Sequence, residues 1–263
     1  MSTSKNSSMH PSPARLQTVR DVLVLLLLSQ TLGWLAGPSS ALTLPTRALL
    51  GGALISCSFA CARTRGWGCL GLGTIFFALA ASSSVHADSL LELLCLPAHA
   101  TRWTLPLLAW ALGCSALAHR GRPLLALEDI DALGRYAIAS TFAAHGLEAL
   151  LRNPEFVALL EGSAQQLGCR SFPATAIDPC LTLIGLADLA LALLLVLGPR
   201  TLRTPLLIYV CAWGALTAAS RSVAHGFEGV PGTLLRSANW GLPLALLMLG
   251  SPTGRSGRRT LRD

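Results

Sequence analysis

Charge is what this sequence has least of. Asp, Glu, Lys and Arg together make up 13% of its 263 residues, whereas soluble globular proteins carry about 25%. Aromatic residues are also scarce, at 6%, and the mean hydropathy is +0.56. Such a composition excludes an ordinary soluble domain and predicts a protein embedded in a lipid bilayer.

Motifs for nucleotides, metals and serine hydrolysis are missing too. The sequence has no GxxxxGK[ST], no GxSxG and no CxxC, and His86, His99, His119 and His225 lack the spacing of zinc ligands. The net charge of +7 could suggest a nucleic-acid partner. However, the basic residues lie in short segments between apolar blocks, so we interpret them as topology signals and expect no nucleic acid.

The apolar residues that remain form blocks of helical length. Runs such as Leu189 to Leu197 are apolar on all sides, whereas the strands of a membrane barrel alternate apolar and polar residues. We therefore predict an all-α, polytopic membrane protein with about eight transmembrane helices. Their expected ranges are 22–37, 48–62, 67–82, 103–118, 134–151, 181–197, 204–219 and 238–250.

The distribution of basic residues gives an orientation. With eight spans, one side of the membrane receives fourteen of the 20 basic residues and the other receives six, namely Arg47, Arg102, Arg152, Arg170, Arg221 and Arg236. By the positive-inside rule, both termini are cytoplasmic in a bacterial inner membrane. The alternative is a cleaved signal peptide ending near Ala41. Residues 1–18 and 251–263 are polar, and we predict disordered tails there.

Short motifs that recur along the sequence indicate an internal duplication. Arg63-Thr64 recurs as Arg200-Thr201, and Trp103-x-Leu105-Pro106-Leu107 recurs as Trp240-x-Leu242-Pro243-Leu244. Both pairs lie 137 residues apart. We therefore predict two parallel four-helix units, a degenerate copy over 19–120 and a second unit over 132–250.

Ionisable residues gather within the second unit. A charge inside a membrane is costly, so each such residue needs a partner or a function. Counting helix rise from the expected span ends places these side chains about 10 Å below the outer surface. We predict one ligand-binding site made by His145, Glu148, Asp188, Arg221, Arg236 and Asn239.

Structural roles for these residues remain open alternatives. Glu148 and Arg152 could form an i, i+4 ion pair at the interface, and Asp188 could pair with Arg221 or Arg236. The positions of the first unit that match His145, Glu148 and Asp188 are Gln30, Gly33 and Gly51. Because none of these three positions carries an ionisable side chain, we interpret the first unit as the structural half.

Eight cysteines are present. Cys57, Cys61, Cys69, Cys114 and Cys211 fall within apolar blocks, and we expect packing roles for them. Cys169 and Cys180 lie in the long segment placed outside the membrane, and we predict a disulfide between them.

The polar residues of the second unit occur in a recognisable order. Arg135-Tyr-Ala, Thr141-Phe142-x-x-His145-Gly146, Ile184-Gly185-x-x-Asp188-Leu189, Trp213-Gly214-x-x-Thr217-Ala218-x-x-Arg221 and Arg236-x-x-Asn239-Trp240 follow one another over about 132–250. This pattern resembles the DoxX-like family of bacterial integral membrane proteins, except that Ser222 follows Arg221 where relatives tend to have Pro. The resemblance implies a four-helix bundle with a quinone-facing site, associated with membrane redox complexes.

Three functions remain compatible with the sequence. The first is a redox-linked or quinone-interacting subunit that works with a membrane redox partner, because no motif for a flavin, haem or iron–sulfur centre is present. The second is a small-solute or proton-coupled transporter, suggested by repeated units and embedded acid and His residues. The third is a structural or assembly protein whose charges only fix helix packing.

Overall fold

The structure is a computed structural model, and it describes residues 12–37, 44–62, 66–85, 87–117, 125–169 and 173–250. These residues are all-α and contain no strand. The termini of the chain, 1–11 and 251–263, lie outside the described residues, as does most of each predicted tail. Helix α1 nevertheless begins at Pro13, so the predicted disorder up to residue 18 is wrong over its last six residues.

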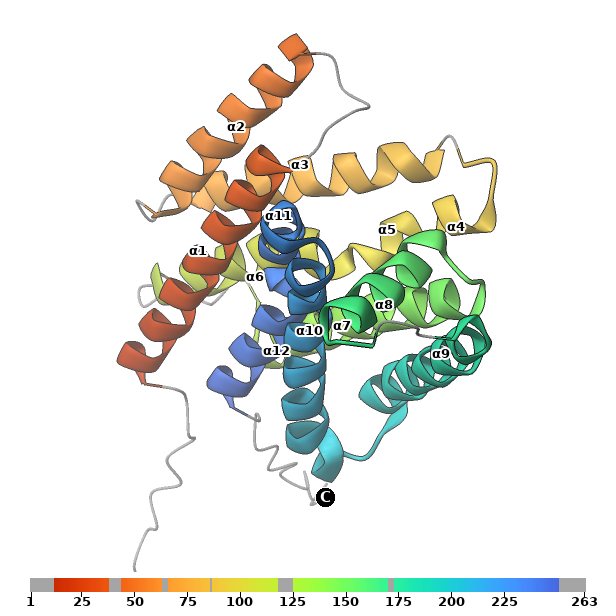
Figure 1. The fold of residues 1–263 in the computed structure, drawn as a ribbon. Helices are drawn as coiled ribbons and strands as arrows, with labels where there is room; N and C mark the ends of the chain where they lie inside the picture. The colour runs from red at the N-terminus through yellow and green to blue at the C-terminus, as the bar shows by residue number, and fades with distance from the viewer. Residues whose placement is uncertain are drawn as a thin grey trace, which may run out of the picture.

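The first unit consists of four long helices with two short ones between the third and the fourth (Figure 1). The long helices are α1 (Pro13–Ala36), α2 (Leu44–Ala62), α3 (Gly66–Val85) and α6 (Ala100–Leu117), and the short ones are α4 (Leu90–Leu93) and α5 (Cys95–Ala98). Ser12 caps α1 by accepting from the backbone N–H of Arg15, and Pro13 occupies a position where no helical donor is lost.

The second unit has the same number of long helices. They are α7 (Leu127–Leu150), α9 (Ala174–Leu197), α10 (Arg203–His225) and α12 (Ser237–Leu249). Shorter elements connect them: α8 (Pro154–Gln166), the 3₁₀ turns η2 (Arg200–Leu202) and η3 (Gly226–Gly229), and α11 (Val230–Leu235). Helix α8 lies in the segment that the sequence presented as a long loop.

The chain is an all-α, polytopic membrane protein. Five helical segments among the described residues are long and apolar enough to cross a membrane: Ala14–Ala36, Leu44–Cys61, Trp67–Val85, Thr175–Leu197 and Arg200–Leu235. The other three predicted spans are also helical, as α6, α7 and α12. Helix α12 has only 13 residues, and α7 carries charged residues at both ends, including Asp131 and Glu148.

Helix starts follow the spacing of the predicted duplication. Helix α3 starts at residue 66 and α10 at residue 203, while α6 starts at 100 and α12 at 237. Pro106 and Pro243 stand inside α6 and α12 at equivalent positions. The duplication itself stays a prediction, and these matched starts are compatible with it.

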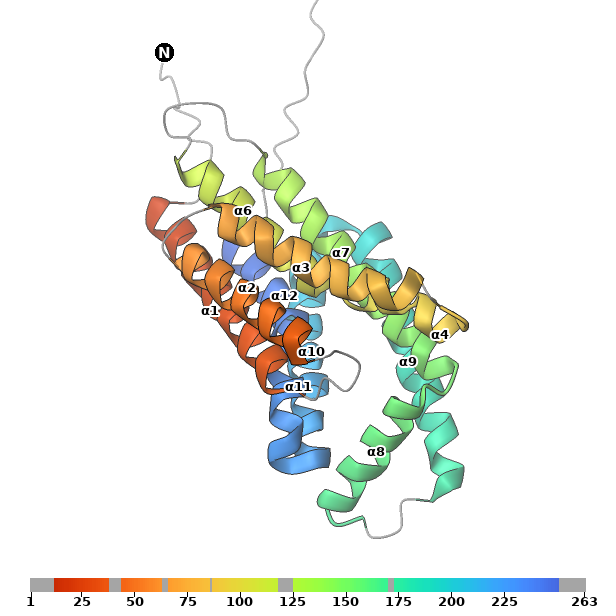
Figure 2. The same cartoon turned by 90° about the horizontal axis from the view of Figure 1, so that it is seen from above.

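The two units share one hydrophobic core. Helix α1 packs against α12, and α6 packs against α7, so that buried residues such as Leu23, Leu105, Ile138 and Leu242 belong to a single cluster. Figure 2 shows α1 and α2 on one side of the molecule and α8 and α9 on the other, with α3 running across between them. The first unit therefore supports the wall of the second.

The first unit buries more polar side chains than its sequence suggested. Its buried residues include Gln30, Thr31, Ser58 and Arg102. Thr31 and Ser58 share a hydrogen bond of 2.9 Å between their hydroxyls. Apolar composition around these positions concealed a set of polar contacts between α1 and α2.

Candidate functional site

A cavity of about 230 Å³ lies in the second unit among α7, α9 and α10, with α8 over it. It exists because the helices of the two units pack differently. In the first unit α2 and α3 run along each other, whereas α9 and α10 make few contacts and α8 packs onto α10 instead. The space left between α9 and α10 becomes the cavity.

Five of the six predicted site residues line this cavity: His145, Asp188, Arg221, Arg236 and Asn239. The sixth, Glu148, is buried one turn further along α7, behind His145. The structure therefore brings together the side chains that the sequence placed at one depth.

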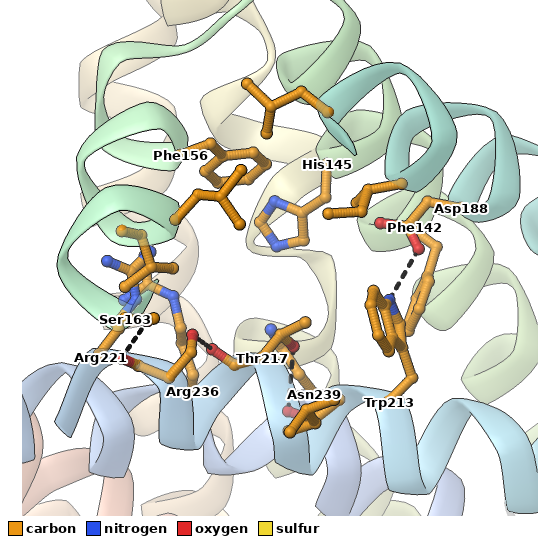
Figure 3. A pocket seen from close by; sticks show the side chains of 17 residues that line it. Phe142, His145, Phe156, Ser163, Asp188, Trp213, Thr217, Arg221, Arg236 and Asn239 are labelled. Atoms are coloured by element: carbon orange, nitrogen blue, oxygen red, sulfur yellow. Dashed lines mark hydrogen bonds between the residues drawn. The ribbon is translucent and has the colours of Figure 1, made fainter. Parts of the chain in front are cut away.

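The polar groups are divided between two ends of the cavity (Figure 3). Arg221 and Arg236 lie at one end, Asp188 and Trp213 at the other, and the His145 ring lies between them. Much of the remaining wall is apolar and includes Phe142, Phe156, Leu159, Leu160, Leu181, Ile184 and Leu216. The arrangement suits a flat or elongated apolar molecule with a polar group at each end.

Glu148 is the hydrogen-bond partner of His145. The carboxylate oxygen Oε2 lies 2.8 Å from Nδ1 of the imidazole, at the i, i+3 spacing of α7. The alternative pairing of Glu148 with Arg152 is wrong, because Arg152 contacts Asp178 of α9 at 2.6 Å. Glu148 therefore fixes the orientation of the ring from behind.

Asp188 is 5% exposed, and its partner is an indole rather than an arginine. Nε1 of Trp213 donates to its carboxylate at 2.9 Å. The alternative pairing with Arg221 or Arg236 is not the one observed, and the imidazole of His145 is bonded to Glu148. This hydrogen bond connects α9 to α10 across one end of the cavity.

The two arginines share a carboxylate that the sequence reasoning did not identify. Glu155 of α8 lies 3.5 Å from Arg221 and 3.9 Å from Arg236, and its side chain is 68% exposed. An ion pair with so exposed a partner is weak. Nε of Arg221 is buried and has no hydrogen-bond partner among the described residues. Arginine N–H groups at this end of the cavity can therefore still donate to a ligand.

The first unit contributes polar groups behind the cavity. Thr101 of α6 donates to the Asn239 side chain at 2.8 Å, and the buried Arg102 follows it. Nε and Nη2 of Arg102 have no hydrogen-bond partner within the described part of the chain. Its charge interacts with those of Arg221 and Arg236. The arginine end of the cavity therefore carries a concentration of positive charge.

Glycines allow the helices around the cavity to approach closely. A Cβ on Gly146 would lie 2.8 Å from the carbonyl oxygen of Gly185, and a Cβ on Gly185 would lie 2.7 Å from that of Gly146. On the other side, a Cβ on Gly214 would lie 2.6 Å from the carbonyl oxygen of Asn239. The glycines next to His145 and Trp213 in sequence thus set the positions of these side chains.

The turn between α7 and α8 also positions the site. Arg152 ends α7 with a φ of +58°, and its guanidinium donates to the carbonyl of Ala149 at 3.0 Å. Asn153 then caps α8 by accepting from the backbone N–H of Glu155 at 3.0 Å. Since the chain turns sharply here, α8 folds back over the cavity and delivers Phe156 to its wall.

Cys169 and Cys180 are both free in the structure. Cys169 is exposed after α8, whereas Cys180 lies within α9, which begins seven residues before the predicted 181. The predicted disulfide is therefore not formed in this structure.

Compared with known proteins, the chain matches no family model, no curated protein and no solved structure. The DoxX-like resemblance therefore rests on its motifs alone. The structure gives those motifs a shared location, because His145, Asp188, Trp213, Thr217, Arg221, Arg236 and Asn239 all line the same cavity.

Proposed function

We propose that this chain is a DoxX-like protein of the bacterial inner membrane that binds a quinone in the cavity of its second unit, as a subunit of a membrane redox complex. One observation carries the proposal: the cavity has polar groups at its two ends and a largely apolar wall. A quinone head group has the same pattern, with two carbonyl oxygens on opposite edges of a flat apolar ring.

Each polar residue has a role in this proposal. Arg221 and Arg236 donate to one carbonyl oxygen, since Arg carries five N–H donors and stays charged. His145 and Asp188 are the residues that exchange protons when the quinone takes up two electrons and two protons. The electrons come from the partner subunit. After His145 has given up a proton, its ring remains hydrogen-bonded to Glu148.

The second candidate is a proton-coupled transporter. Its support is the burial of Asp188 and the buried pair of His145 and Glu148 beside one cavity, because embedded acid and His residues are typical of proton relays. A transporter needs the cavity to open to both sides of the membrane. A subunit that only binds a quinone from the bilayer does not.

Binding of a short-chain quinone to the purified protein in detergent tests the proposal. We expect saturable binding in wild type and at least ten-fold weaker binding in Arg236→Gln, since one hydrogen bond to a charged group contributes about 1.5–3 kcal/mol. Arg200→Gln is the matched control, because Arg200 is exposed on η2 and does not line the cavity, so this variant should bind the quinone as wild type does.

Two results decide between the candidates. Equal binding in Arg236→Gln and Arg200→Gln, with both variants folded, rules out the cavity as the quinone site. Solute uptake into vesicles that collapses in Asp188→Asn, without quinone binding, supports the transporter instead.

A further inference from the structure

A second cluster of reactive side chains lies far from the cavity residues in sequence, where α2 meets α3. The Sγ atoms of Cys61 and Cys69 are 2.7 Å apart, and the two residues are only 2% and 6% exposed. Cys57, one turn earlier on α2, is half-buried beside them. None of the three lines the cavity described above.

The backbones bring this pair together. A Cβ on Gly68 would lie 2.6 Å from the carbonyl oxygen of Cys57 and 2.8 Å from the backbone nitrogen of Cys61. A Cβ on Gly71 would lie 2.6 Å from Sγ of Cys57. Because these glycines remove the side chains that would separate α2 from α3, the two helices reach the range in which Cys side chains can bond.

The two thiols are free and hydrogen-bonded to each other, because Sγ of Cys61 donates to Sγ of Cys69. A disulfide can form only between cysteines whose side chains face one another at close range. The hydrogen bond places Cys61 and Cys69 in that arrangement.

A metal site is the other chemistry that clustered cysteines suggest. Within the described residues, no group of three or more His, Cys, Asp or Glu side chains is arranged to hold a metal ion. The pair therefore lacks the further ligands that a tetrahedral thiolate site needs.

We propose that Cys61 and Cys69 form a reversible disulfide that connects α2 to α3, with a low-molecular-weight disulfide as the oxidant. The thiolate of one cysteine attacks a sulfur of the oxidant, which forms a mixed disulfide and releases one thiol. The thiolate of the other cysteine then displaces the second thiol and forms the Cys61–Cys69 bond. The two cysteines lose two protons and two electrons, and the oxidant is reduced to two thiols.

In the predicted topology, this disulfide responds to the redox state of the cytoplasm. Arg63 and Arg65, which follow Cys61, belong to the basic residues assigned to the cytoplasmic side, where thiols are kept reduced. The resting state is then the dithiol, and oxidative conditions lock the end of α2 to the start of α3. This inference does not depend on the quinone proposal, because it uses different residues and a different chemistry.

Differential thiol labelling of the full-length wild-type protein tests the proposal. The purified protein in detergent is incubated with hydroxyethyl disulfide, a small neutral oxidant, then denatured and treated with a light maleimide. It is next reduced and treated with a heavy maleimide, and the label on each cysteine is read by peptide mass spectrometry. We expect Cys61 and Cys69 to carry the heavy label in equal fractions, and the light label when the oxidant is omitted.

Controls within the same chain make the outcome specific. Cys211, half-buried on α10 and bonded to the carbonyl of Trp240, should keep the light label. Cys57→Ala should leave the heavy labelling of the pair unchanged. The proposal is overturned if Cys61 and Cys69 keep the light label after oxidation, or if a parallel digest without reduction contains a peptide pair that joins Cys57 to Cys69 instead of Cys61 to Cys69.

Discussion

At the scale of single residues, Asp188 shows what a sequence can and cannot predict about a membrane site. A carboxylate within an apolar run indicates burial and the need for a partner, and both are observed. The identity of the partner was wrong because any donor on a neighbouring helix could serve. The choice of the Trp213 indole depends on the rotation of α10, which hydrophobic blocks do not encode.

The hydrogen bond between Trp213 and Asp188 predicts an asymmetric response to mutation. Trp213→Phe removes the donor and leaves a buried carboxylate, so the free energy of unfolding should fall by about 1–3 kcal/mol. The double variant Trp213→Phe/Asp188→Leu removes both polar groups and should recover part of that loss. Chemical denaturation in detergent, followed by circular dichroism, measures both.

Trp67→Phe is the matched control for the loss of a tryptophan, because Trp67 is exposed on α3 and should change the stability little. A double variant that is less stable than Trp213→Phe alone would contradict the role given to this hydrogen bond.

At the scale of helices, the predicted C-terminal ends of the helices lie closer to the observed ends than the predicted N-terminal ends do. The expected ends of 62, 151 and 197 lie within one residue of those of α2, α7 and α9, whereas α1, α7 and α9 start seven to nine residues early. Hydropathy marks only the apolar part of a helix. Hydropathy does not detect a polar first turn, such as that of α7 with Glu128 and Asp129.

Helix α8 was missed for a related reason. It has 13 residues and no fully buried side chain, so it resembles neither a membrane span nor a core helix. The signal that could have revealed it is Asn153-Pro154-Glu155, a capping residue followed by proline and an acid. Missing α8 also meant missing Glu155 and Phe156 at the site.

The crossing of α7 and α9 predicts different effects for two glycine substitutions. Gly146→Ala places a methyl group 2.8 Å from the carbonyl oxygen of Gly185, so the helices must separate and stability should fall by about 1–3 kcal/mol. Gly52→Ala in α2 meets nothing within 4 Å. It should be neutral, or stabilising by up to about 1 kcal/mol.

Thermal unfolding of both alanine variants in the same detergent provides the comparison. Equal melting temperatures for Gly146→Ala and Gly52→Ala would show that the contact between α7 and α9 tolerates a side chain and that the close approach is unimportant.

At the scale of the whole molecule, the distribution of basic residues predicts the orientation in the membrane. With the termini in the cytoplasm, a reporter fused at Gly254 should be cytoplasmic, and one inserted at Gly168, after α8, should be periplasmic. Alkaline phosphatase and green fluorescent protein fusions measure the two locations. The same location for both would remove at least one of the four long helices of the second unit as a span.

The sequence also predicted that the polar residues of the second unit share one depth, because helix rise and direction suffice for that. It could not predict that α9 and α10 stand apart. That separation depends on how α8 packs against α10 through Gly162 and Ala224, where a Cβ on the glycine would lie 3.1 Å from that of Ala224. Depth was therefore predictable, and the volume of the cavity was not.

The shortness of α12 has a consequence for the depth of the site. Thirteen residues span about 20 Å, whereas the hydrocarbon core of a bilayer is about 30 Å thick. In the predicted orientation, with Leu249 at the cytoplasmic boundary, α12 ends about 10 Å below the outer boundary, beside Arg236 and Asn239. Eight of its residues are buried against other helices, so protein and not lipid encloses this end. A ligand must therefore pass between helices to reach these polar groups.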